Sequence, residues 1–331
     1  MNKALLFSKF IKYDILDQLM INNKSATMLL YKPVDIYIDI QSVYKRVLSE
    51  TLLNTDVKVL SVNILNLAGH YRHYFSRRGI NNRVYLVNGL NNSNTIVSKL
   101  NAENKHLFAI VQKLVQYFPL VYYIEKDYNS SAIIMGLIQS ETIPHNHNSF
   151  IISNDVYSYQ IPALIPSTFL LRPSTNTKLV TSNTVIDSMY PRKGSIVTSD
   201  LSSALLPVIM AYHKCPELGM QMINNFKTTI NIIRDKIANN KILNNYNSPI
   251  MFKNEPKEII DRLYLSDLII ISRVYDKSYE SLVNNWRIYK PYNMTVLTNA
   301  LDNLFNRDTE NIFNYMFLLE VNEDFFNRVG P

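Results

Sequence analysis

The sequence is poor in cysteine and glycine, and it contains no long apolar run. Its one cysteine, Cys215, cannot form a disulfide within the chain, and its apolar neighbours favour a buried, inert thiol over a nucleophile. The longest apolar runs, such as Leu268–Ile271, fall far short of the roughly 18 residues that a membrane-spanning helix needs. The segment Met1–Met20 lacks the apolar core of a signal peptide. We therefore expect a soluble, cytoplasmic protein without a membrane partner.

The motifs of several enzyme classes are missing as well. The seven glycines form neither a Gly-rich phosphate loop nor a G-x-S-x-G nucleophile elbow, which argues against NTPase and serine hydrolase chemistry. His145, His147 and His213 lack a cysteine pair and a further histidine at ligand spacing. A zinc site is therefore not expected.

The residues that are abundant indicate a globular protein. Apolar residues make up 47% of the chain and there are 22 tyrosines, which excludes compositional disorder. The length of 331 residues allows one large domain or a domain with a helical extension. A net charge of +7 and a pI near 9.2 favour contact with a polyanion, although proteins that bind none also carry such an excess.

Strand and helix patterns alternate over the first two thirds of the chain. Short β-branched runs predict strands, and apolar residues at helical spacing predict helices between them, one of which ends at Gly79. Residues 178–190 look like a further strand followed by a helix. The other expected strands cover residues 34–39, 83–89, 120–127, the start of 149–161, and 169–172; the other expected helices cover 41–53, 57–79, 105–118 and 130–139.

Three aspartates stand at or just past the ends of expected strands: Asp39, Asp127 and Asp155. Because the carboxyl ends of parallel strands meet at one end of a sheet, these residues are expected to converge, close to Asn88. Taken singly, each aspartate also suits a helix N-cap or an Asx-turn, which needs no metal. Both interpretations stay open.

The chain changes character beyond Pro191. Apolar residues at helical spacing in residues 201–212, 219–240, 256–275 and 296–305 predict helices. We therefore expect an α/β domain with a mostly parallel sheet at residues 1–190, followed by an α-helical extension at residues 191–331.

Four segments in order along the chain resemble motifs of the flap-endonuclease and phage-type 5′-3′ exonuclease family, a branch of the PIN-like superfamily. A later segment, KLVTSNTVIDSMY, resembles the strand and helix before that family's helix-hairpin-helix, whereas MAYHKCPELGMQM matches the hairpin itself poorly. The resemblance covers Pro33–Ile233 and implies a three-layer, PIN-like α/β fold. The four segments are IDIQSVYKR (Ile38–Arg46), RVYLVNG (Arg83–Gly89), EKDYNSSAIIMGLI (Glu125–Ile138) and IISNDVYSYQIPAL (Ile151–Leu164).

The resemblance implies a cluster of metal-binding carboxylates, and this chain has lost several of them. Asp39, Asp127 and Asp155 stand at metal-binding positions of the family. Hydrolysis with two metal ions needs carboxylates that offset the charge of two divalent cations about 4 Å apart. We expect a catalytic remnant that holds no cofactor, or one weakly bound Mg²⁺ or Mn²⁺. Neutral residues at positions that are acidic in the family are Asn88, Asn129, Ser130 and Tyr157.

Basic residues are expected to contact nucleic acid. The segment His70–Gly79 places three arginines beside three aromatic residues at one helix end, which suits phosphate contact and base stacking. The same cations also suit a solvated helix C-terminus, where they complement the helix dipole. Other candidates lie in the first motif and where the family has a helical arch. The expected nucleic-acid contacts are Arg72, Arg77, Arg78, Lys45, Arg46 and Lys105.

Together these features predict a catalytically degenerate nuclease homologue that binds DNA, or a protein complex on DNA, in replication, repair or viral assembly. The abundance of Asn, Lys and Ile is typical of AT-rich genomes, as in many phages. Two alternatives stay open. One is a working metal-dependent 5′ nuclease with a reduced metal site, and the other is a structural or assembly protein that keeps only the fold.

Overall fold

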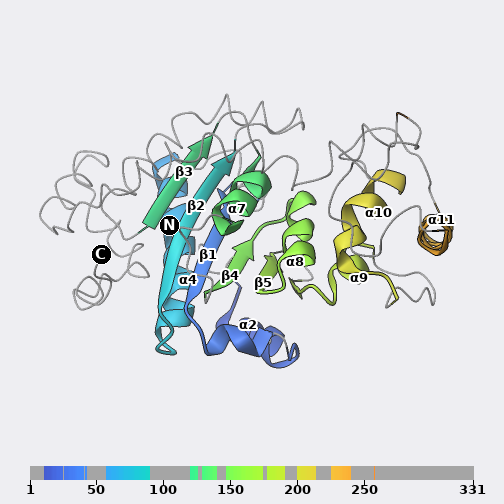
Figure 1. Ribbon diagram of the computed structural model, residues 1–331. Coiled ribbons are helices and arrows are strands. Elements are labelled where there is room, and N and C mark those ends of the chain that lie inside the picture. Colours follow the sequence, from blue (N-terminus) through green and yellow to red (C-terminus); the bar gives the residue numbers. More distant parts are fainter. Residues whose placement is uncertain are drawn as a thin grey trace, which may run out of the picture.

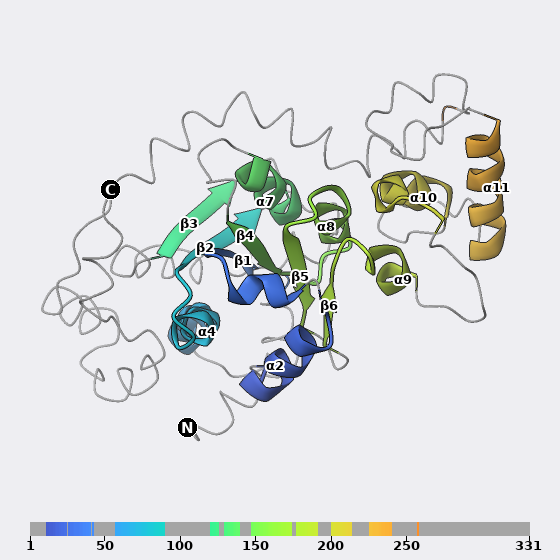
Figure 2. The same cartoon turned by 60° about the horizontal axis from the view of Figure 1, so that its bottom comes forward.

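The computed structural model describes residues 11–24, 26–40, 42, 57–89, 120–125, 129–139, 147–173, 177–190, 200–213, 225–239 and 257. Within them, six strands form one sheet in the order β3-β2-β1-β4-β5-β6 (Figures 1 and 2). The first five strands pair in parallel, and β6 is antiparallel to β5. The strands are β1 (Val34–Asp39), β2 (Asn82–Gly89), β3 (Leu120–Glu125), β4 (Asn148–Ile152), β5 (Thr168–Arg172) and β6 (Lys178–Val180).

The order of the strands reverses beside β1. The chain moves from β1 outward to β2 and β3, then returns to place β4 on the other side of β1. In doubly wound sheets, such a reversal leaves a crevice outside the carboxyl ends of the two central strands, and functional sites form there. A functional site is therefore expected at the carboxyl ends of β1 and β4.

Helices cover both faces of the sheet, so the architecture has three layers. In Figure 2, α4 and α7 lie on opposite sides of the strands. The helices are α2 (Tyr13–Ile21), α4 (Val57–Ser76), α7 (Ser130–Gln139), α8 (Gln160–Leu164), α9 (Val185–Met189), α10 (Leu206–Tyr212) and α11 (Phe226–Ala238), with short 3-10 turns at η1 (Ala26–Leu30), η2 (Tyr157–Tyr159) and η3 (Ser203–Leu205).

Burial on two faces explains the near-continuous apolar sequence of the central strands. On one face, Phe150 of β4 meets the rings of Tyr71 and Phe75 from α4, with ring centroids 6.1 and 5.3 Å away. On the other face, Tyr37 and Tyr85 of neighbouring strands stack at 4.8 Å and join the core formed with α7 and α8. Each aromatic ring thus removes a large apolar area from water.

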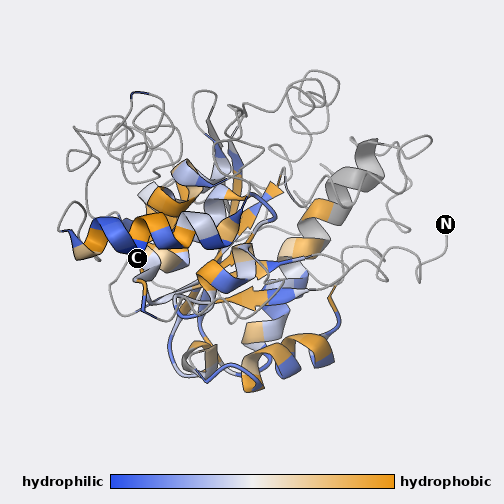
Figure 3. Cartoon of the chain, turned by 90° about the vertical axis from the view of Figure 1, so that its right-hand side faces the viewer, coloured by the Kyte–Doolittle hydropathy of each residue, from blue (hydrophilic) through white to orange (hydrophobic). Residues whose placement is uncertain are grey.

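The described part of the expected extension packs into the same core. Side chains of α10 and α11, such as Ile209 and Ile230, belong to one buried cluster with Tyr37 of β1. Figure 3 shows α11 lengthwise, with hydrophilic and hydrophobic residues alternating along it, as expected of a helix with one buried face. The expected domain boundary between residues 190 and 191 stays a prediction. Side chains from both sides of it belong to the same buried cluster.

The expected fold class is confirmed: a three-layer α/β domain with a mostly parallel sheet. The run at residues 149–161 is a strand only as far as Ile152, because the chain turns there into η2 and α8. The helices expected at 105–118 and 296–305 lie outside the described residues, as do all but one residue of each of those expected at 41–53 and 256–275. Among the described helices, none is both long enough and apolar enough to cross a membrane.

The end of α4 is fixed by Gly79, as the sequence predicted. The amide of Gly79 donates to the carbonyl of Ser76 at 2.9 Å, and the amide of Ile80 donates to the carbonyl of Phe75 at 3.2 Å. These two bonds form a Schellman motif, which requires a left-handed residue at its centre. Gly79 has φ of 71°, where a side chain is strained.

Substituting Gly79 tests this helix stop. Gly79→Ala should lower the free energy of unfolding by about 1 kcal/mol, because a Cβ in the left-handed region is disfavoured. No atom lies within 4 Å of the added Cβ, so the cost would be conformational and not steric. Urea denaturation measures it, and an unchanged or increased stability would contradict the assigned strain.

A buried ionic cluster ties three strands together at the amino end of the sheet. Asp35 of β1 is fully buried, and its carboxylate accepts from Nε and Nη2 of Arg83 at 2.7 and 3.0 Å. The two residues lie directly opposite in the register of β1 and β2. His147, which precedes β4, places Nδ1 3.1 Å from the same carboxylate. Burying this charge is tolerated because both of its oxygens have partners.

Removing the carboxylate of Asp35 tests how much this cluster contributes to the stability of the fold. Asp35→Ala should destabilise the protein by about 3 kcal/mol, since it leaves a partly buried guanidinium without its partner. Asp14→Ala on the exposed side of α2 is the matched control and should change the unfolding free energy by less than about 0.5 kcal/mol. Equal losses in urea denaturation of the two variants would show that the cluster is not structural.

Candidate functional site at the carboxyl end of the sheet

Asp39 and Asp155 come together at the carboxyl end of the sheet. Asp39 is the last residue of β1, and Asp155 lies three residues beyond the end of the neighbouring β4. Residue Ile38 pairs with Ile152 in this part of the sheet. The two aspartates therefore flank the reversal of strand order, where the sequence expected them.

Three serine hydroxyls form a continuous path between the two carboxylates, which we call the serine chain (Ser153, Ser158 and Ser131). Oγ of Ser153 lies 2.8 Å from Oδ2 of Asp39 and 3.0 Å from Oγ of Ser158. Oγ of Ser131 lies 2.7 Å from Ser158 and 2.5 Å from Oδ2 of Asp155. All three serines are fully buried. The polar contacts of this site are thus made inside the protein.

Further groups from β2 and α7 surround Asp39. The amide of Gly89 at the end of β2 donates to Oγ of Ser130 at 3.0 Å, and Ser130 is in turn hydrogen bonded to Asp39. Asn88, beside Gly89, is fully buried at the same end of the sheet. Ser42 adds an amide contact of 3.3 Å to Oδ1 of Asp39. Neutral donors therefore enclose Asp39.

The alternative structural roles of these residues are present as well. Oδ1 of Asp39 accepts the amide of Ser42, three residues on, and Oδ1 of Asn129 accepts the amide of Ala132 at 2.7 Å at the start of α7. Oδ1 of Asp155 lies 3.3 Å from the amide of Tyr157, an Asx-turn geometry. Local capping and convergence at one site therefore coexist, and neither excludes the other.

The serine chain is one proton short when both aspartates are ionised. Its three hydroxyls supply three protons, whereas the four oxygen–oxygen contacts need four. A proton on one carboxyl completes the path. Burial raises the pKa of Asp39, and this outweighs the opposing hydrogen bonds from Ser153, Ser130 and Ser42. The direction of this shift favours Asp39, rather than Asp155, as the carboxyl group that holds the additional proton.

The described residues do not fit a divalent metal ion in this arrangement. Among them, no group of three or more His, Cys, Asp or Glu side chains gathers closely enough to hold one. Mg²⁺ and Mn²⁺ require several oxygen ligands with net negative charge. Here Oδ2 of Asp39 and Oδ2 of Asp155 already contact hydroxyl groups. Asp127, the third expected ligand, lies outside the described residues.

Sequence reasoning missed two features of this site. The first is Glu125, the last residue of β3, whose backbone pairs in register with Gly89 and so ends at the same end of the sheet. It stands two residues before Asp127 in the same motif, which was a readable signal. The second is the serine chain, whose members come from two segments distant in the sequence, Ser131 and the pair Ser153 and Ser158.

The expected basic patch lies at the other end of the sheet. Its residues end α4, and β2 begins directly afterwards at Asn82, so they sit where the strands start. The eight residues of β2 span about 25 Å at roughly 3.3 Å per residue. A single phosphate contacted by this patch is therefore far from Asp39 and Asp155.

The patch is also largely committed to internal contacts. Arg72 is only 7% exposed, so it is not placed to meet a phosphate, and the rings of Tyr71, Tyr74 and Phe75 are buried and cannot stack on bases. The prediction that these rings stack on bases is therefore wrong, because the rings are buried in the core. Arg77 and Arg78 stay candidates for nucleic-acid contact. Lys45, Arg46 and Lys105 lie outside the described residues.

Comparison with solved structures returns several proteins, some of them in complex with DNA. The chain is similar to the bacteriophage T5 protein co-crystallised with metal ions (10% identity, 87% of this chain and 100% of that chain, TM-score 0.48). It is also similar to human GEN1 in complex with Holliday junction DNA (9%, 87% and 71%, 0.47). A third likeness is to the catalytic core of Rad2 in complex with a DNA substrate (12%, 93% and 97%, 0.45).

The phage T5 protein is described as a flap endonuclease. No protein-family model and no curated protein matches the sequence. With identities of at most 12% and TM-scores below 0.5, the likenesses carry no argument about activity. Any inference about activity therefore rests on the order of the strands and on the residues at the carboxyl end of the sheet.

The raised pKa of Asp39 predicts a pH-dependent stability. The folded state holds a proton that the unfolded chain releases near pH 4, so the contribution of Asp39 is complete below about pH 4 and is lost as pH rises through its folded pKa. Asp39→Asn removes this titration. Its unfolding free energy, relative to wild type, should therefore increase with pH above about 4, by at most about 1.4 kcal/mol per pH unit.

Urea denaturation between pH 4 and 8 measures this difference. Asp235→Asn, which changes an exposed aspartate of α11, is the control and should show no such trend. A difference between Asp39→Asn and wild type that stays constant, or falls with pH, would mean that Asp39 is ionised in the folded protein.

Proposed function

We propose that the chain is a catalytically degenerate 5′-nuclease-like protein that binds DNA or a protein complex on DNA. The observation that supports this most is the serine chain between Asp39 and Asp155. At the place where the family resemblance implies a cluster of carboxylates, hydroxyl groups hold the two aspartates, and Asn88 and Tyr157 stand at positions that are acidic in the family.

The loss of charge has a direct chemical consequence. Two-metal hydrolysis stabilises both the attacking and the leaving oxygen with cations about 4 Å apart, and those cations need carboxylates to hold them. Because burial raises the pKa of Asp39, Asp155 is the carboxylate of the serine chain that more readily carries a negative charge. One such carboxylate offsets a quarter of the charge of two divalent ions, so binding both is strongly disfavoured.

Binding to DNA is supported by the composition and by the ordered motifs. The net charge of +7 favours association with a polyanion through counterion release. A degenerate nuclease that keeps this charge can still recognise DNA structure without cutting it. A role in a replication, repair or viral assembly complex, inside the cell, belongs to the same proposal and rests on the family resemblance and the base composition that the sequence implies.

One observation favours a second candidate, the active metal-dependent 5′ nuclease. Glu125 ends β3 in register with Gly89, and Asp127 follows two residues later. Glu125 therefore belongs to the strand end beside the site, and Asp127 is a further acid nearby in the sequence. With Asp155 they could supply three carboxylates, which is the minimum that the active alternative needs.

A cleavage assay separates the two candidates. With 5′-flap and nicked duplex DNA, the purified full chain in Mg²⁺ or Mn²⁺ should give no products, because the site lacks the charge that holds two ions. The same samples should bind the DNA in a salt-dependent way. The active alternative is right if cleavage occurs and is abolished by both Asp155→Ala and Glu125→Ala but not by Asp235→Ala, a matched change on an exposed helix.

A further inference from the structure

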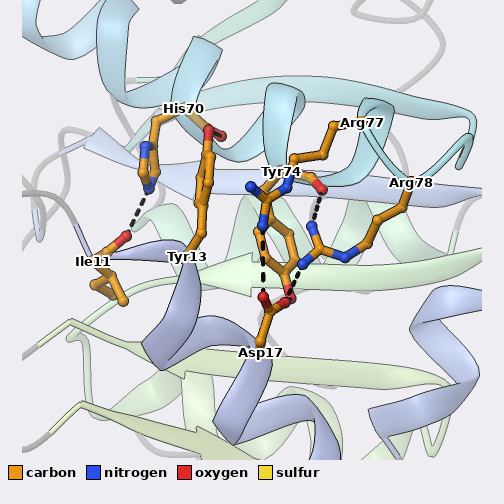
Figure 4. A network of polar contacts seen from close by, with 7 residues as sticks. All are labelled: Ile11, Tyr13, Asp17, His70, Tyr74, Arg77 and Arg78. Atoms are coloured by element: carbon orange, nitrogen blue, oxygen red, sulfur yellow. Dashed lines mark hydrogen bonds and ion pairs between the residues drawn. The ribbon is translucent and has the colours of Figure 1, made fainter.

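The N-terminal helix α2 is fastened to the end of α4 by an aromatic side chain. The ring of Tyr13 fits among residues 70, 73, 74 and 77 of α4, the spacing at which four residues form a hole for a neighbouring side chain. It stacks on His70 with centroids 4.6 Å apart and lies 5.5 Å from the ring of Tyr74. Figure 4 shows Tyr13 between these two rings.

A second contact fastens the start of α2 independently of charge. Burial lowers the pKa of His70 to about 4, so its ring is neutral, and Nε2 lies 2.8 Å from the carbonyl of Ile11. The hydroxyl of Tyr13 donates to the carbonyl of His70 at 3.0 Å. Leu16 and Met20 bury the inner face of α2. These contacts hold α2 in addition to, and independently of, its ion pairs.

One carboxylate of α2 meets two guanidinium groups. Asp17 forms a hydrogen-bonded ion pair with Arg78, and its other oxygen lies 3.6 Å from Nη2 of Arg77. The hydroxyl of Tyr74 donates to the same carboxylate at 2.8 Å. Figure 4 shows all three donors around Asp17. An oxyanion held by two arginines and a hydroxyl is also the environment in which proteins bind a phosphate.

The two guanidinium groups are pre-positioned by aromatic rings. Arg77 lies over the ring of Tyr13 at 4.1 Å, and Arg78 lies over the ring of Tyr74 at 3.9 Å. Nη1 of Arg78 also donates to the carbonyl of Tyr74 at 2.6 Å. These contacts do not involve Asp17, so the arginines would keep their places if it withdrew. The group remains accessible, with side chains 35%, 23% and 38% exposed for Arg77, Arg78 and Asp17.

We infer that Arg77 and Arg78 form a binding site for a phosphate of the DNA backbone, and that Asp17 occupies this site as an internal competitor when DNA is absent. This inference rests on the DNA binding in the proposed function, and it locates one contact at the amino end of the sheet. Binding exchanges the carboxylate of Asp17 for a phosphate, while Tyr13 keeps α2 in place. The contact selects for the backbone and not for sequence.

The strengths of the competing contacts permit this exchange. Partly exposed ion pairs are individually weak, and a carboxylate on a nearby helix can be displaced by a phosphate that also releases counterions from DNA. The C-terminal dipole of α4 opposes an anion, but two full positive charges outweigh a half charge. Removing the competitor should therefore strengthen binding by a factor in the range of about three to ten, and not by orders of magnitude.

A binding titration of the full chain tests the competition. Asp17→Asn should bind a short duplex about threefold to tenfold more tightly than wild type in fluorescence anisotropy at low salt. Asp14→Asn is the matched control, because it removes the same charge from the exposed side of the same helix. Adding Arg77→Gln and Arg78→Gln to Asp17→Asn should abolish the gain and reduce the log–log salt slope by up to about 0.9 per lost contact. The pair Lys178→Gln and Lys227→Gln controls for net charge.

A second variant covers the case in which Asp17→Asn folds poorly. Tyr74→Phe removes one hydrogen bond to Asp17 without changing charge, and it should strengthen DNA binding in the same direction by a smaller factor. Equal affinities of Asp17→Asn and Asp14→Asn for DNA, with binding retained, would overturn the competition. Asp17 would then only join α2 to the end of α4, and the proposed function would stand. If neither wild type nor Asp17→Asn binds the duplex at low salt, the site and the proposed DNA binding both fail.

Discussion

The burial of Asp39 is the constraint on which the site depends. A carboxyl group removed from water must find donors or give up its charge; Asp39 finds donors, and burial raises its pKa. The reversal of strand order between β1 and β4 brings Ser153 and Asp155 against it. The serine chain then satisfies the buried oxygens with neutral groups. In a site built for metal ions, the same crevice would have to collect negative charge instead.

The sheet separates two kinds of polar chemistry. Hydroxyl groups and aspartates occupy its carboxyl end, whereas the arginines that end α4 and the pair formed by Asp35 and Arg83 occupy its amino end. The length of β2 keeps these groups roughly 25 Å apart. DNA that contacts both ends must therefore span one side of the molecule, and a change at one end leaves the direct contacts of the other intact. The two sets of polar contacts are therefore independent of each other.

Much of the fold was predictable because its signals are local. The β-branched runs of β1 and β2, the apolar stripe of α4 and the stop at Gly79 each follow from neighbours in the sequence. The convergence of Asp39 and Asp155 followed from parallel strand order. Burial could not be foreseen in the same way: the tyrosines of His70–Gly79 looked suited to DNA, yet they pack against Phe150 and Tyr13, partners distant in sequence. The serine chain was missed for the same reason.

Manganese binding tests the central claim most directly, since Mn²⁺ reports its own free concentration by electron paramagnetic resonance. Titration of the full chain should leave the signal of free Mn²⁺ the same as with the variant Asp155→Asn, because the serine chain already engages both aspartates and burial raises the pKa of Asp39. Stoichiometric uptake of Mn²⁺ by wild type that disappears in both Asp39→Asn and Asp155→Asn would contradict the account, and it would show that this end of the sheet is a working metal site.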